Sequence, residues 1–156
     1  MSNFEYCAII WHFCGKMNNA KIEKLQERGL KIVYSDYDAD YDELLIRFNT
    51  TTMLQQRLKK IILEVFKSIR CKNPEYLHDM FLSKDLNYSL RNHHPVTQPI
   101  KNSTNFGLRS IAYLGSNLWN NIKNQTMKQT QDLDEFKIEL KALNVSKITG
   151  LSISLV

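Results

Sequence analysis

The sequence predicts a mostly α-helical protein, an irregular bundle of about six short helices with a long irregular connection around residues 84–106. The 156 residues include only 5 Gly and 3 Pro, and 43% of them are hydrophobic and 24% charged, which is a globular composition. Apolar residues recur at helical spacing in most segments, and several of these segments follow a Ser, Thr or Asp that can cap a helix. We expect a single helical region over residues 1–145 and a frayed tail over 146–156.

The first segment, between Phe4 and Cys14, is apolar on nearly every face. A helix of that kind must be buried on all sides, and a short chain rarely surrounds its own first helix. We therefore expect this segment to contact a preceding domain or a second copy of the chain. A central core helix is the alternative interpretation.

Residues 19–34 predict an amphipathic helix with separate apolar and basic sides. The apolar side, expected to face inward, consists of Ile22, Leu25, Ile32 and Val33. The basic side consists of Lys21, Lys24, Arg28 and Lys31. Gly29 lies within this helix, where glycine is unfavourable, so we expect it to pack closely against another backbone.

An acidic turn follows, and Asp40 with Glu43 forms a capping pair for a short helix. Its inward residues are expected to be Tyr41, Leu44, Leu45 and Phe48. Thr52 and Gln55 form a second capping signature, before the clearest helical pattern of the chain. Its apolar face comprises Leu54, Leu58, Ile61, Ile62, Val65, Phe66 and Ile69. Its other side carries Arg57, Lys59, Lys60, Lys67 and Arg70.

Three further helices complete the prediction. Asn73, Pro74 and Glu75 can start a short helix, which buries Leu77, Met80 and Phe81. Ser110 begins a helix with inward residues Ile111, Leu114, Leu118, Trp119 and Ile122. Asp132 with Glu135 caps the last helix, whose inward residues are Leu133, Phe136, Leu140 and Leu143.

The residues that could carry chemistry do not form a recognisable active site. A polymerase needs closely placed carboxylates for two metal ions, and the sequence contains no Asp-Asp pair. Cys7, Cys14 and Cys71 lack the paired spacing of a zinc site and are expected to be free and mostly buried thiols. We therefore expect no metal, no cofactor and no enzymatic activity.

A series of motifs suggests a relationship to a known family. The first motifs are Tyr6-Cys7, Trp11-His12-Phe13-Cys14, the block from Asn19 to Arg28, and Ile32-Val33-Tyr34-Ser35-Asp36-Tyr37. The later ones are Glu64-Val65-Phe66-Lys67, Tyr88-Ser89-Leu90-Arg91, Phe106-Gly107-Leu108-Arg109-Ser110 and Leu118-Trp119-Asn120. Their order resembles the region just after the polymerase domain of non-LTR (LINE-like) retrotransposon reverse transcriptases, and the likeness fades after Leu143.

The resemblance implies a non-catalytic C-terminal fragment of an RNA-directed DNA polymerase, truncated from its upstream polymerase domain. Such a fragment would help to hold template RNA or the RNA–DNA product. Related proteins often end in a cysteine-rich segment similar to a zinc knuckle, but no Cys follows Cys71 here. That module therefore cannot be transferred to this chain.

Basic side chains are the candidate contacts to nucleic acid. The formal net charge of +5 favours anionic partners, because Lys and Arg gain affinity for phosphates by releasing counterions. Tyr88 and Arg91 add a stackable ring and a guanidinium in an irregular segment. The complete candidate set is Lys21, Lys24, Arg28, Lys31, Lys59, Lys60, Lys67, Arg70, Tyr88 and Arg91. Alternatively these are solvated helix faces, partly neutralised by Glu23, Glu27 and Glu64.

The sequence is also compatible with two other interpretations. The chain could be a helical protein-interaction module without a nucleic-acid role, or a relic without any selected role. No segment has the length of apolar sequence that a membrane span requires, so we expect no membrane contact and a soluble, intracellular protein. Nucleus and cytoplasm are not distinguished.

Overall fold

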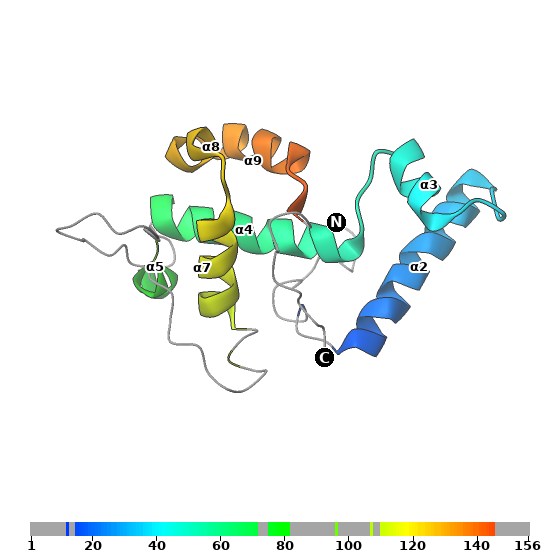
Figure 1. Ribbon diagram of the computed structural model, residues 1–156, viewed down its shortest axis with the longest axis horizontal. Helices are drawn as coiled ribbons and strands as arrows, with labels where there is room; N and C mark the ends of the chain where they lie inside the picture. The colour runs from blue at the N-terminus through cyan, green and yellow to red at the C-terminus, as the bar shows by residue number, and fades with distance from the viewer. Residues whose placement is uncertain are drawn as a thin grey trace. The chain divides into compact units, whose positions relative to one another are not determined.

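The computed structural model describes residues 12, 15–71, 75–81, 96, 107 and 110–145, and the regular structure of these residues is entirely helical (Figure 1). The helices are α2 (Lys16–Tyr34), α3 (Tyr41–Arg47), α4 (Met53–Cys71), α5 (Glu75–Met80), α7 (Ile111–Asn121), α8 (Gln125–Gln129) and α9 (Leu133–Ala142). The all-α prediction is confirmed.

Several predictions fall on residues outside this description. They concern the apolar segment between Phe4 and Cys14, of which only His12 is described and is buried, and the frayed tail. They also concern Tyr88, Arg91 and most of the irregular connection around residues 84–106, where Val96 is the described residue.

The chain divides after Leu58, inside α4, into two compact units. The first contains α2, α3 and the beginning of α4. The second contains the remainder of α4 with α5, α7, α8 and α9.

The core of the second unit is built on the apolar face of α4. Ile61, Ile62, Val65 and Phe66 are all buried, as the helical spacing predicts. The Phe66 ring stacks on Phe136 of α9 with a centroid distance of 3.9 Å. Trp119 of α7 lies 6.4 Å from Phe66 and 6.1 Å from Phe136, so each pair is within the range of favourable aromatic contacts. These three rings join α4, α7 and α9.

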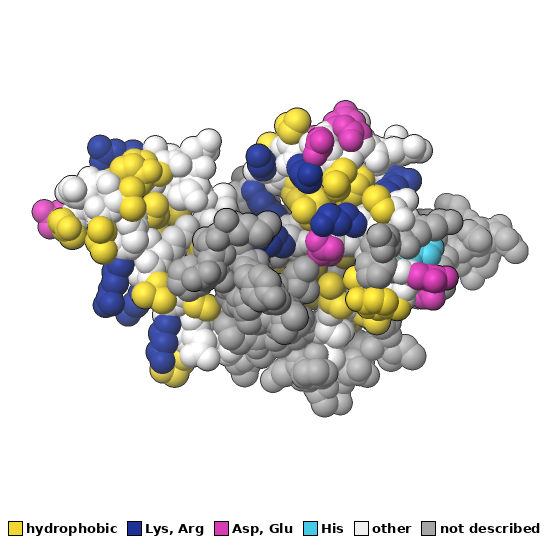
Figure 2. All heavy atoms as spheres, turned by 180° about the vertical axis from the view of Figure 1, so that it is seen from behind, with side chains coloured by type: hydrophobic (Ala, Val, Ile, Leu, Met, Phe, Trp, Pro, Cys, Tyr) yellow, Lys and Arg dark blue, Asp and Glu magenta, His cyan; other side chains and the backbone are white. Residues whose placement is uncertain are grey.

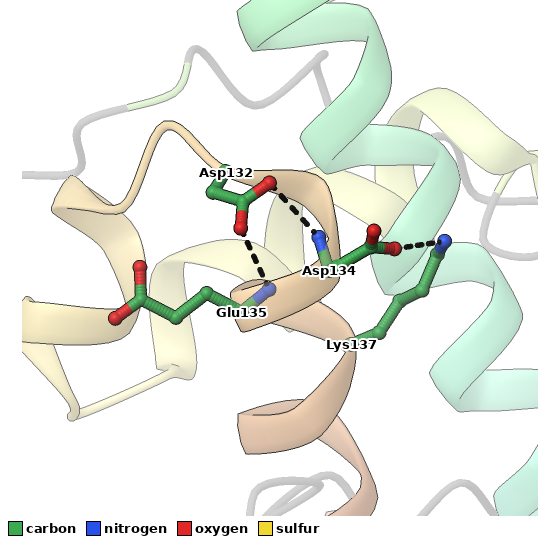
Figure 3. A network of polar contacts seen from close by, with 4 residues as sticks. All are labelled: Asp132, Asp134, Glu135 and Lys137. Atoms are coloured by element: carbon green, nitrogen blue, oxygen red, sulfur yellow. Dashed lines mark hydrogen bonds and ion pairs between the residues drawn. The ribbon is translucent and has the colours of Figure 1, made fainter.

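Predicted caps start three of the helices. The Thr52 hydroxyl accepts from the Gln55 N–H at 3.3 Å before α4, and the Ser110 hydroxyl accepts from the Tyr113 N–H at 3.3 Å before α7. At α9, the Asp132 carboxylate accepts from the N–H groups of Asp134 and Glu135 (Figure 3). These oxygens satisfy N–H groups that have no partner within the helix.

The first unit is closed by contacts between the end of α2 and α3. Tyr34 stacks on Phe48, and Arg47 forms an ion pair with Asp36 at 3.0 Å. Leu44 and Leu45 of α3 are buried, as predicted. Asp40 occupies the predicted N-cap position of α3, although its side chain makes no capping hydrogen bond.

The prediction for the inward side of α2 is wrong. Leu25, Ile32 and Val33 are 49%, 63% and 71% exposed, and only Ile22 of that side is half-buried. Gly29 has no described atom within 4 Å of the position that a Cβ would take, so the close packing expected there is also absent. The side of α2 that faces its neighbours carries the polar side chains of Glu23 and Gln26.

In the second unit the structure differs from the sequence prediction in smaller respects. Met80 was expected to be buried with α5 but is 46% exposed, whereas Phe81, just after the helix, is buried. Cys71 is exposed rather than buried. Helix α8 was not predicted, because its five residues are too few for a periodic pattern. It begins at an Asn124 cap and its Met127 is completely buried.

Two glycines of the helices should respond oppositely to substitution by alanine. A Cβ on Gly115 of α7 would lie 2.8 Å from Cγ2 of buried Val65 and 3.2 Å from the Phe81 ring. Gly115→Ala should therefore destabilise the protein by about 1–3 kcal/mol through overpacking. Gly29→Ala is the matched control, and should stabilise by about 0.5–1 kcal/mol because its surroundings are open. Urea unfolding measures both free energies, and a neutral Gly115→Ala would contradict the close approach of α7 and α4.

Candidate nucleic-acid interface

The rotation of α2 about its own axis is set by Glu23. Its carboxylate accepts hydrogen bonds from the backbone N–H groups of Leu54 at 2.9 Å and Met53 at 3.2 Å. These two residues lie in the first turn of α4, where N–H groups lack helical partners and the helix dipole is positive. A carboxylate from another helix therefore caps α4.

Two more polar side chains complete this contact. The Tyr41 hydroxyl donates to a Glu23 carboxylate oxygen at 2.7 Å and lies 2.8 Å from the amide oxygen of Gln26. Gln26 in turn donates to the Thr51 carbonyl at 3.1 Å. Because Glu23 and Gln26 are needed on the inner side of α2, its apolar and basic sides are directed to solvent.

The same contact changes the acidity of Tyr41. Burial is the main cause that raises the pKa of its phenol far above the ordinary value of 10.0, and the hydrogen bond to Glu23 and its negative charge act in the same direction. The phenol thus remains a hydrogen-bond donor to Glu23.

Three predicted site residues on α2 are well placed to meet an anion. Lys21, Lys24 and Arg28 are exposed, and within the described part of the chain no carboxylate lies within ion-pair distance of them. Their spacing puts them in one row along the helix, over about 10 Å at 1.5 Å per residue. We call these three residues the cation row. Lys31 continues the same side but is half-buried and forms an ion pair with Glu27 at 2.9 Å.

The candidates on α4 have contacts within the fold. Lys67 pairs with Glu64 at 2.8 Å. Lys59 donates to the Lys141 carbonyl of α9 at 2.7 Å, and burial lowers the pKa of its ammonium. Arg70 donates to the Lys128 carbonyl of α8, and Lys60 is half-buried. These residues belong to the second unit, and most of them bind other helices or a neighbouring carboxylate.

Two features of the site were missed by reasoning from the sequence. Arg57 was expected on the basic side of its helix but is 2% exposed, so it belongs to the interior. Glu23 was read as a neutralising surface charge, whereas it positions α2. Its partners in α4 are 30 and 31 residues away in the sequence and Tyr41 is 18 away, so no local pattern could have identified it.

Other sites found in the described residues do not suit an anion. An open groove of about 590 Å³ lies in the first unit and is lined by Asp42, Leu45, Ile46, Asn49, Thr50, Thr51, Thr52 and Gln55. It contains a carboxylate and no Lys or Arg. Over the described ranges, no three His, Cys, Asp or Glu side chains gather as a metal site would require. Nor does any helix in them have the length and apolar character to cross a membrane.

Comparisons with known proteins do not assign the chain to a family. No protein-family model, no curated protein and no solved structure matches it.

The contact of Glu23 with α4 can be tested by its removal. Glu23→Ala should lower the free energy of unfolding by about 1–2 kcal/mol, because two N–H groups of α4 lose their acceptor and the Tyr41 hydroxyl keeps only the Gln26 amide oxygen. Glu27→Ala, on the same helix, removes only the pair with Lys31 and should cost about 0.5 kcal/mol. Urea denaturation compares them, and equal losses would show that Glu23 does not anchor α2.

The raised pKa of Tyr41 makes a further prediction about alkaline pH. A raised pKa means that the folded state prefers the protonated phenol, so this stabilisation is complete below pH 10 and is lost as the pH rises above it. The loss should be below about 1.4 kcal/mol per pH unit, because the phenol is partly accessible to water. Tyr41→Phe should remove this loss between pH 9 and pH 11 in urea unfolding. Tyr37→Phe, at an exposed ring, should retain it.

Proposed function

We propose that this chain is a non-catalytic helical fragment that contacts nucleic acid through the cation row of α2. The main support is that Lys21, Lys24 and Arg28 are exposed together on one side of a helix. In the described part of the chain, no carboxylate lies within ion-pair distance of them. Such cations bind phosphates without first breaking an internal ion pair, and they gain affinity by releasing counterions.

The dimensions of the cation row suit a short stretch of backbone. About 10 Å of helix corresponds to about three nucleotides of a duplex strand, at 3.4 Å each. Arg28 adds a planar guanidinium that can bind two phosphate oxygens, whereas the lysines act as point charges. Contacts of this kind position a nucleic acid and carry no sequence preference.

The order of motifs supports a more specific assignment within the same proposal. The chain would be a relic of the region after the polymerase domain of a non-LTR retrotransposon reverse transcriptase, in contact with RNA or an RNA–DNA hybrid. Its partner in the intact enzyme would be the upstream polymerase domain. The absence of an Asp-Asp pair from the sequence supports a role in holding nucleic acid rather than in polymerisation.

A protein-interaction module is the second candidate, and one observation favours it. Leu25, Ile32 and Val33 are exposed next to the cation row, and exposed apolar side chains that cluster on one face are typical of binding surfaces. In this alternative the cations only keep the surface soluble.

A charge reversal separates the two candidates. The triple variant Lys21→Glu, Lys24→Glu, Arg28→Glu should abolish binding to RNA at low salt. For the unchanged chain, the logarithm of the binding constant should fall against the logarithm of salt concentration with a slope of about −2 to −3, because three phosphates are neutralised at roughly 0.7–0.9 each. Fluorescence anisotropy with labelled RNA measures both.

The control reverses the same number of charges elsewhere. Lys123, Lys137 and Lys141 lie in the second unit and outside the candidate set, so their replacement by Glu should reduce binding far less than the α2 variant. Equal losses would mean that only net charge matters. Absence of binding by the unchanged chain at low salt would support the protein-interaction module.

A further inference from the structure

A second row of residues runs along α2 beside the cation row. Leu25, Gly29 and Ile32 follow one another at helical spacing, and Val33 borders them. We call these four residues the apolar row. At 3.6 residues per turn it lies about a quarter of a turn from the cation row. Its three side chains are 49–71% exposed. Figure 2 shows basic and hydrophobic side chains next to one another over the part of the molecule that contains α2.

Gly29 makes the middle of the apolar row flat. No described atom lies within 4 Å of the position of a Cβ there, and the residue itself is exposed. A planar ring can therefore approach the helix backbone between the side chains of Leu25 and Ile32, which a larger residue at position 29 would prevent.

The two rows match the two chemical sides of an unpaired strand. A single strand exposes a line of phosphates and, beside it, the apolar faces of its bases. In a duplex the base faces are stacked on one another, so only phosphates and base edges reach a protein surface. We infer that α2 binds single-stranded nucleic acid in preference to duplex, with phosphates on the cation row and bases against the apolar row. This inference rests on the proposed function.

A second copy of the chain fits this face less well. An antiparallel pair of α2 helices packed through their apolar rows would place Lys21, Lys24 and Arg28 of both copies on the same side of the contact. Like charges brought together in this way oppose association. A strand of phosphates instead neutralises the cations while its bases cover the apolar side chains.

The test compares a single-stranded RNA with a duplex of the same sequence at equal, low salt, using the full chain. The unchanged protein should bind the single strand about ten-fold more tightly. The variant Leu25→Gln, Ile32→Gln, Val33→Gln removes the apolar row and keeps all charges. It should lose most of this preference by weakening single-strand binding about ten-fold, with duplex binding unchanged. Gln is a good helix former, and circular dichroism checks that helix content is retained.

The possible results distinguish this inference from the proposed function. Equal binding of both forms by the unchanged chain, abolished by the charge reversal, would overturn the inference and leave the function standing. Absence of any binding would remove the function and the inference together. If sedimentation shows a dimer that the Gln variant dissociates, while the single-strand preference is unchanged, the apolar row is an interface between copies and the inference is wrong.

Discussion

The hydrogen bonds from the first turn of α4 to the Glu23 carboxylate are the constraint on which the surface of the first unit depends. Free N–H groups at a helix start are costly to bury, and an acid from a neighbouring helix satisfies two of them. Once Glu23 and Gln26 must face inward, the rotation of α2 is fixed. Lys21, Lys24 and Arg28 are then directed outward, together with aliphatic side chains that amphipathic spacing alone would bury.

In the second unit the apolar and basic residues of a helix have different roles from those of α2. Helix α4 buries its apolar face, and Phe66 meets the rings of Trp119 and Phe136. Two basic side chains of α4 donate hydrogen bonds to carbonyls of neighbouring helices. Lys59 donates to the Lys141 carbonyl of α9, and Arg70 to the Lys128 carbonyl of α8. A lysine or arginine that donates to a helix-end carbonyl satisfies an acceptor without a helical partner. Lys59 and Arg70 of α4 thus connect helices, while Lys21, Lys24 and Arg28 of α2 are exposed.

How far the sequence predicts these features depends on the distance over which each signal acts. The caps at Ser110 and Asp132 and the buried face of α4 follow from residues a few positions apart, and each was predicted correctly. The orientation of α2 was predicted wrongly, because the partners of Glu23 in α4 are distant from it in the sequence. The sequence likewise identifies the basic residues but does not show which of them have partners within the fold. The contacts of Lys59 and Lys67 in the structure distinguish these two residues from the cation row.

One side chain of α7, Asn120, binds the backbone of Val96. The side-chain amide of Asn120 accepts a hydrogen bond from the Val96 N–H at 3.2 Å and donates one to the Val96 carbonyl at 3.1 Å. It thus satisfies both backbone groups of Val96, as the backbone of another segment could. Phe81 lies against the same helix at Gly115. Phe81 and Val96 therefore both contact α7. Because Val96 is buried, a side chain without an amide at position 120 would leave its N–H and carbonyl without these partners, at a cost of about 1–3 kcal/mol for each group.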